Sequence, residues 1–302
     1  MTPVIRQVWL FTRYEFQDAL RSRRAWVVLG LFWATALLTM NGFLSILLRL
    51  ENELAETLLL PAADKPGAVI NALWESDRFQ QMVARSVQSD TLVSELVGLS
   101  PIALVFAGLL FFYTPLLVAL VAPVRVAEEW SNGTVRFVVF RAPRWAWSAG
   151  KVLGQAGLLL VALSSSALAA WGLMRLRMIG AEDWTHAWQM GGWALRAWFY
   201  GFAFLGLLMG LAPAVRSPSR CTGLALLLLF LVTLAAWAAD RYAAETGWRA
   251  FLPFVRALLP QGHSLSLWRQ SAAHFVPAAL FLLALGTGYS VLGYAWLRRR
   301  DI

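Results

Sequence analysis

Residues 101–124 read PIALVFAGLLFFYTPLLVALVAPV, a stretch in which every side chain is uncharged and most are apolar. An α-helix rises about 1.5 Å per residue, so about 20 apolar residues cross the hydrocarbon core of a bilayer. Inside that core a helix satisfies its own backbone hydrogen bonds, which an irregular segment cannot do. The stretch therefore predicts a membrane-spanning helix.

Five further stretches meet the same requirements of length and polarity. They occupy residues 25–48, 152–174, 192–211, 221–239 and 276–297. No Lys, Asp or Glu falls inside any of the six, and the only charge is Arg196, whose long stem is expected to reach the outer membrane boundary. The pattern predicts an all-α polytopic membrane protein with six transmembrane helices, in which residues 1–302 form one transmembrane domain.

Composition points the same way. Hydrophobic residues make up 59% of the chain and charged residues 14%, far from the balance of a soluble protein. The net charge of +9 is explained by the basic rim that membrane proteins place on the cytoplasmic side, and we expect no nucleic-acid partner. The single cysteine, Cys221, excludes an intrachain disulfide. Residues 1–20 contain charges among their apolar positions, so no cleavable signal peptide is expected.

Basic residues are distributed unevenly between the two sides of the predicted bundle. One side has 15 basic and 5 acidic residues, and it consists of 1–24, 125–151, 212–220 and 298–302. The other side has 10 basic and 12 acidic residues, and it consists of 49–100, 175–191 and 240–275. Loops rich in Lys and Arg stay in the cytoplasm. We therefore expect a multi-pass protein of the cytoplasmic (inner) membrane with both termini in the cytoplasm.

Two segments outside the spans have a recognisable pattern. Residues 1–24 form an amphipathic helix that should lie flat in the inner headgroup layer, although Leu10 falls on its polar side and Glu15 near its apolar side. Residues 49–100 are broken by Pro61 and by Lys65-Pro66-Gly67. With helical patterns over 50–56 and 79–96, this segment is predicted to form a small helical cap outside the membrane.

The predicted inner loop, 125–151, has the most specific sequence. It reads AEEWSNGTVRFVVF over 127–140, then RAPR over 141–144 and GK at 150–151. This order resembles the permease subunits of type 2 ABC transporters, in which an acidic residue precedes Gly-Thr, an amphipathic segment and a Pro-containing turn follow, and Gly-Lys opens the next span. The ending RRRD at 298–301 is also similar to that family.

The loop is chemically suited to binding a soluble protein. Gly133 can end one helix and Thr134 can cap the next. The resemblance implies that this segment is a coupling helix seated in a groove of an ATPase subunit. Charges of both signs and apolar groups would meet that partner: Glu128, Glu129, Arg136, Arg141 and Arg144, with Phe137, Val138 and Phe140. From spacing alone, an ordinary solvated loop remains the alternative.

No ATP-binding loop of the form GxxxxGK[ST] occurs, because residues 148–152 read SAGKV. The chain is therefore expected to bind no cofactor and to be no enzyme itself, with ATP and magnesium on a partner subunit. The resemblance implies an exporter, in which a dimer of permeases, formed by a second copy or a homologous permease, works with cytoplasmic ABC ATPase subunits. Membrane lipids are the remaining expected partners.

Several polar and small residues have two interpretations. Asn41, Thr114 and Ser165 could line a substrate path or simply bond to neighbouring helices, and Gly201, Gly206 and Gly210 could pack within one subunit or between two. His186, His263 and His274 have no metal-ligand spacing, so no metal site is expected.

An apolar interior suits an amphiphile, lipid or drug as substrate. Two alternatives to an ABC permease remain, a secondary transporter and a membrane-embedded enzyme. The first would place ionisable residues near the bilayer midplane, and the second would need a convergent polar cluster.

Overall fold

The computed structural model describes residues 3–57, 95–96, 99–135, 137, 142–178, 184–215, 217–242 and 251–298. Within these residues, six helices are long and apolar enough to cross a membrane. They are α2 (Arg23–Thr57), α6 (Pro101–Ser131), α8 (Arg144–Arg177), α9 (Trp184–Leu211), α10 (Pro218–Tyr242) and α13 (Ala272–Arg298). The described part of the chain contains no strand, so the predicted all-α membrane fold is confirmed.

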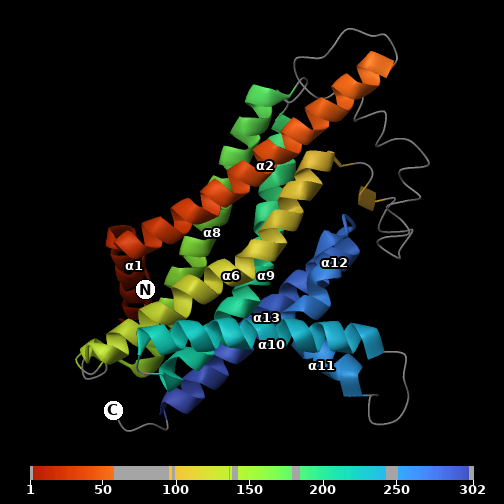
Figure 1. The fold of residues 1–302 in the computed structure, drawn as a ribbon. Helices are drawn as coiled ribbons and strands as arrows, with labels where there is room; N and C mark the ends of the chain where they lie inside the picture. Colours follow the sequence, from red (N-terminus) through yellow and green to blue (C-terminus); the bar gives the residue numbers. More distant parts are fainter. Residues whose placement is uncertain are drawn as a thin grey trace.

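Shorter helices complete the described chain. The N-terminal helix α1 (Pro3–Arg21) precedes α2, and a 3₁₀ turn, η1 (Ala212–Ala214), follows α9. Between α10 and α13 lie α11 (Leu252–Leu258), the 3₁₀ turn η3 (Pro260–His263) and α12 (Ser264–Trp268). Figure 1 shows the start of α1 and the end of α13 at one end of the molecule, as six spans between them require.

The six helices include every stretch predicted to cross the membrane and extend beyond several of them. The helix α2 continues to Thr57, so the expected helical pattern over 50–56 belongs to the first span itself. The helix α6 continues through residues 125–131, which were expected in the inner loop. The rest of the expected outer cap, apart from residues 95–96 and 99–100, lies outside the described residues.

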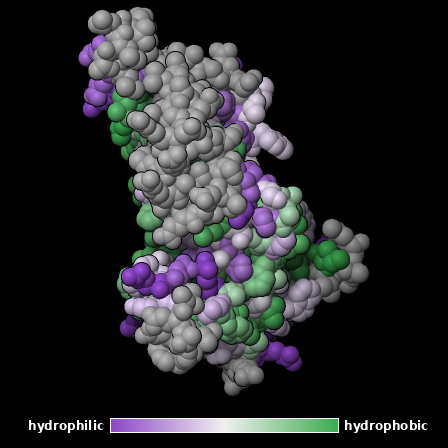
Figure 2. Space-filling model, turned by 90° about the vertical axis from the view of Figure 1, so that its right-hand side faces the viewer, coloured by the Kyte–Doolittle hydropathy of each residue, from purple (hydrophilic) through white to green (hydrophobic). Residues whose placement is uncertain are grey.

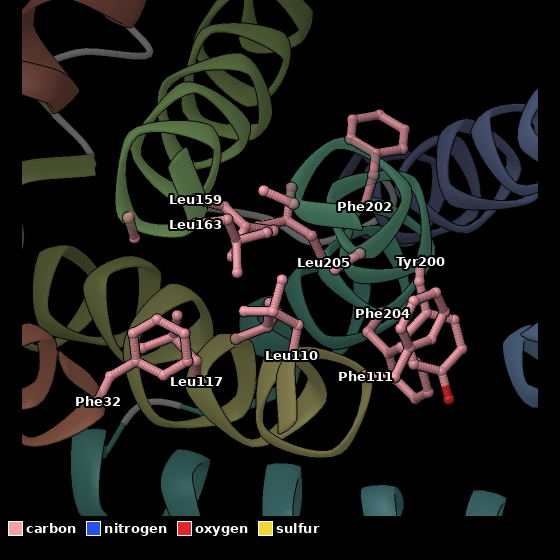
Figure 3. Close-up of a cluster of buried hydrophobic side chains, with 14 of the residues drawn as sticks. Phe32, Leu110, Phe111, Leu117, Leu159, Leu163, Tyr200, Phe202, Phe204 and Leu205 are labelled. Atoms are coloured by element: carbon pink, nitrogen blue, oxygen red, sulfur yellow. The ribbon is translucent and has the colours of Figure 1, made fainter. Parts of the chain in front are cut away.

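The helix α9 is the centre of the packed core. It packs most extensively against α6 and α13, and it also contacts α8. Figure 3 shows the side chains that meet there: Leu110, Phe111 and Leu117 from α6, Leu159 and Leu163 from α8, and Tyr200, Phe202, Phe204 and Leu205 from α9. Helices in lipid gain stability from such close packing rather than from water exclusion.

Glycines bring α9 and α13 into backbone contact. A β-carbon on Gly206 would collide with the backbone of Gly286, and one on Gly293 would collide with the backbone of Gly210. Gly201 instead faces the side chains of Thr114 and Leu159. These glycines therefore pack within one subunit, which answers the question that the sequence left open.

The outer surface of the bundle is apolar in keeping with a lipid environment. On α10, large apolar side chains are exposed at Leu224, Leu227, Phe230, Leu231, Leu234 and Trp237. Figure 2 shows one face of the molecule, and apolar residues gather on the described part of it. Arg196 is half-buried: it donates a hydrogen bond to Gln270 (3.1 Å) and lies over the ring of Trp193.

Candidate functional site

The loop between α6 and α8 begins with a sharp turn. The helix α6 ends at Ser131, and the backbone N–H of Asn132 donates to the carbonyl of Glu128 (3.0 Å). Gly133 then has φ of +71°, a conformation that disfavours residues with a side chain. Beyond the turn Val135 is buried, whereas Phe137 is 75% exposed. The sequence prediction that Gly133 ends a helix is confirmed, and the helix that it ends is the second span.

The other predicted loop residues differ in their exposure and in their partners. Glu128 is partly exposed and forms an ion pair with Arg24 (3.6 Å). Glu129 turns inward, since it forms an ion pair with Lys151 (2.6 Å) and accepts a hydrogen bond from the Trp147 indole (3.1 Å). Arg144 opens α8 and donates to the carbonyl of Arg298 at the end of α13 (3.4 Å), and Thr134 is exposed. The remaining predicted residues, Arg136, Val138, Phe140 and Arg141, lie outside the described residues.

Behind the turn lies a buried cluster of charges from three helices. Glu15 of α1 is 1% exposed and pairs with Lys151 of α8. Its second oxygen accepts a hydrogen bond from Gln155 (2.6 Å) and lies 3.6 Å from Arg125 of α6. Arg125 also pairs with Asp18 of α1. Lys151 thus bridges Glu15 and Glu129, and the charge cluster (Glu15, Asp18, Arg125, Glu129, Lys151 and Gln155) links α1, α6 and α8.

Two glycines let α1 approach α8 closely enough to form these bonds. A β-carbon on Gly150 would collide with Phe11, and one on Gly154 would lie 2.7 Å from the β-carbon of Glu15. Because Gly150 and Gly154 are four residues apart, they share one face of α8 with Lys151 at its edge. The contact holds α1 along the first turns of α8.

The charge cluster keeps Glu15 ionised. Burial by itself raises the pKa of the Glu15 carboxyl, but Lys151, Arg125 and the Gln155 hydrogen bond together lower it more, and the net pKa lies below its ordinary value. A carboxylate in an apolar setting is tolerated only when it is paired in this way. The ends of α6 and α8 are therefore fixed to α1 by electrostatic contacts as well as by packing.

Sequence reasoning missed the main members of the charge cluster. Glu15 was noticed only as an exception to the amphipathic pattern of residues 1–24, and Arg125 and Lys151 were counted as basic loop residues. A signal was present, because a carboxylate on the apolar side of a helix needs a buried cation. Lys151, directly before an uncharged span, is the only lysine on the same predicted side of the membrane as Glu15.

The three polar residues considered for a substrate path have different surroundings. Asn41 accepts a hydrogen bond from Arg177, so it ties α2 to the far end of α8. Ser165 bonds to carbonyls of its own helix, at Val161 (2.7 Å) and Ala162 (3.0 Å). Thr114 is fully buried, and among the described residues its hydroxyl has no partner.

No curated protein sequence matches the chain. The profile of the family described as ABC-2 family transporter protein matches residues 9–302, which include α2 to α13 and most of α1. The match covers nearly the whole chain, so this protein belongs to the ABC-2 family of transporter proteins, as a membrane-spanning permease.

Proposed function

We propose that this chain is the transmembrane subunit of an ATP-driven exporter and that the turn between α6 and α8 receives force from a separate cytoplasmic ABC ATPase subunit. The observation that carries the proposal is the charge cluster, which joins the end of α6, the start of α8 and α1. The cluster lies behind the exposed turn between α6 and α8, which we call the tip. A push on the tip would therefore move two spans and α1 together. Since the sequence has no ATP-binding loop, the nucleotide would be hydrolysed on the partner.

The structure refines the roles that we propose for the tip. Glu128 and Phe137 are exposed enough to touch a partner, whereas Glu129 is engaged by Lys151 and Trp147. We assign Glu128, Gly133, Thr134, Phe137 and Arg144 to the contact surface and Glu129 to positioning it. In the orientation that we propose, the protein spans the inner membrane and both of its termini lie in the cytoplasm. Two permeases, identical or homologous, would form the transport pathway with two ATPase subunits.

A photo-crosslinking experiment tests the contact. A photoreactive phenylalanine analogue at Phe137, in the permease expressed in its native host, should crosslink to a protein that has a nucleotide-binding motif and hydrolyses ATP. The same analogue at Phe112 is the matched control, because Phe112 is 72% exposed but lies in the middle of α6. Crosslinking to the ATPase at Phe112 alone, or at neither position, would overturn the proposal.

A further inference from the structure

A cavity of about 180 Å³ lies between the α1–α2 turn and the helices α6 and α8. Leu205 of α9 contributes to its inner end. The wall includes Leu29, Val118, Leu158 and Leu159. Apolar side chains dominate this wall, and the few polar groups belong to Gln155, Ser165 and the two tryptophans.

The polar groups of the wall favour an apolar occupant over water. Ser165 bonds to its own helix, Gln155 donates to Glu15, and the Trp26 indole donates to the carbonyl of Leu20 (2.7 Å). A water molecule needs two or more polar partners, and these groups are already occupied. The Trp33 indole is the exception, since its buried N–H has no partner among the described residues.

The cavity opens toward the membrane. Two of its wall residues, Val161 of α8 and Trp26 of α2, are 48% and 49% exposed, so the rim is accessible from the lipid side. A cavity of about 150 Å³ is known to hold a benzene-sized molecule. The space therefore accommodates part of one hydrocarbon chain and excludes a whole lipid.

The entrance is basic. Arg21, Arg23 and Arg24 are exposed and stand next in sequence to the wall residues Leu20 and Ala25. Basic residues beside the hydrocarbon core attract anionic headgroups. We propose that the cavity holds one acyl chain of an anionic lipid, taken from the predicted cytoplasmic leaflet, with its headgroup at these arginines.

The position of Gln155 gives the lipid a structural role. This side chain belongs both to the cavity wall and to the charge cluster, where it bonds to Glu15. A bound acyl chain would fill the space beneath the α1–α2 turn and support the docking of α1 on α8. The lipid would therefore stabilise the same block of helices that the exposed tip belongs to.

Native mass spectrometry of the full chain, purified without any ATPase from nanodiscs of phosphatidylcholine and phosphatidylglycerol, tests the proposal. The unaltered chain should retain one phosphatidylglycerol per chain in preference to phosphatidylcholine. Ala162→Leu fills the cavity and should lower retention at least fivefold, whereas Ala284→Leu at an exposed position of α13 should leave it unchanged. Equal retention in these two variants would overturn the proposal.

A double substitution decides the result even if Ala162→Leu fails to fold. Arg21→Gln with Arg23→Gln keeps the cavity intact and should reduce the preference for phosphatidylglycerol at least threefold. An unchanged preference, or none in the unaltered chain, would show that no anionic lipid is selected here. Because the permease is measured alone, these results are independent of the proposed coupling to ATP hydrolysis.

Discussion

Lys151 is the residue on which the proposed coupling of α1, α6 and α8 most depends. Its ammonium group is buried between Glu15 and Glu129, so Lys151→Met would leave two carboxylates without their shared cation. Removing one partner of a buried ion pair typically costs about 3–5 kcal/mol. Since Glu15 keeps Arg125 and Gln155, we predict a loss at the lower end, about 3 kcal/mol of unfolding free energy, measured as a lowered melting temperature in detergent.

The matched control is Arg24→Met, which breaks the half-exposed pair with Glu128. Exposed pairs contribute about 0–1 kcal/mol, so this variant should melt close to the unaltered protein. If both variants shift the melting temperature equally, the charge cluster has no special part in stability.

Acid should release α1 from α8. Because the pKa of Glu15 is lower in the folded protein than its ordinary value of about 4.5, its contribution to stability is complete above that value and is lost as the pH falls through the lowered pKa. The melting temperature of the unaltered protein should therefore drop more between pH 6 and pH 3 than that of Glu15→Gln. The two profiles running parallel over this range would contradict the assignment.

At the scale of helices, the sequence predicted what depends on local composition. Each of the six spans is a long and mostly apolar run, and the bilayer thickness sets its minimum length, so composition alone predicts all six. The pairing of Glu15 with Lys151 joins residues 136 positions apart, and no local pattern contains that information. The sequence likewise does not predict the close contact of α9 with α13. Spaced glycines allow a helix to pack closely but do not identify its partner helix.

The α9–α13 contact can be tested with two glycines of one helix. A β-carbon on Gly286 would lie 2.7 Å from the carbonyl oxygen of Phe202, whereas one on Gly288 would meet nothing within 4 Å. Gly286→Ala should destabilise the protein by about 1–3 kcal/mol through overpacking. Gly288→Ala should be neutral or stabilise it by up to about 1 kcal/mol, since alanine favours helix. Melting temperatures measured side by side check this, and equal values would exclude close backbone contact.

On the scale of the whole molecule, the proposed functions are concentrated at one end. The turn between α6 and α8, the helix α1 and the end of α13 lie at one end of the molecule (Figure 1), and the charge cluster joins α1 to α6 and α8 there. That end also has the excess of basic residues from which the cytoplasmic side was predicted. The proposed contact with an ATPase and the proposed lipid site therefore depend on one orientation in the membrane.

Two serine-to-cysteine variants test this orientation directly. Ser131, at the end of α6, and Ser271, just before α13, are both exposed, and Cys221 is fully buried and should not react. With a membrane-impermeant maleimide on intact cells, Ser271→Cys should be labelled at once. Ser131→Cys should be labelled only after the membrane is permeabilised, because positive charge keeps its side of the bundle in the cytoplasm. The reverse pattern would place the tip outside the cell, beyond the reach of any cytoplasmic ATPase, while leaving the six-helix fold unchanged.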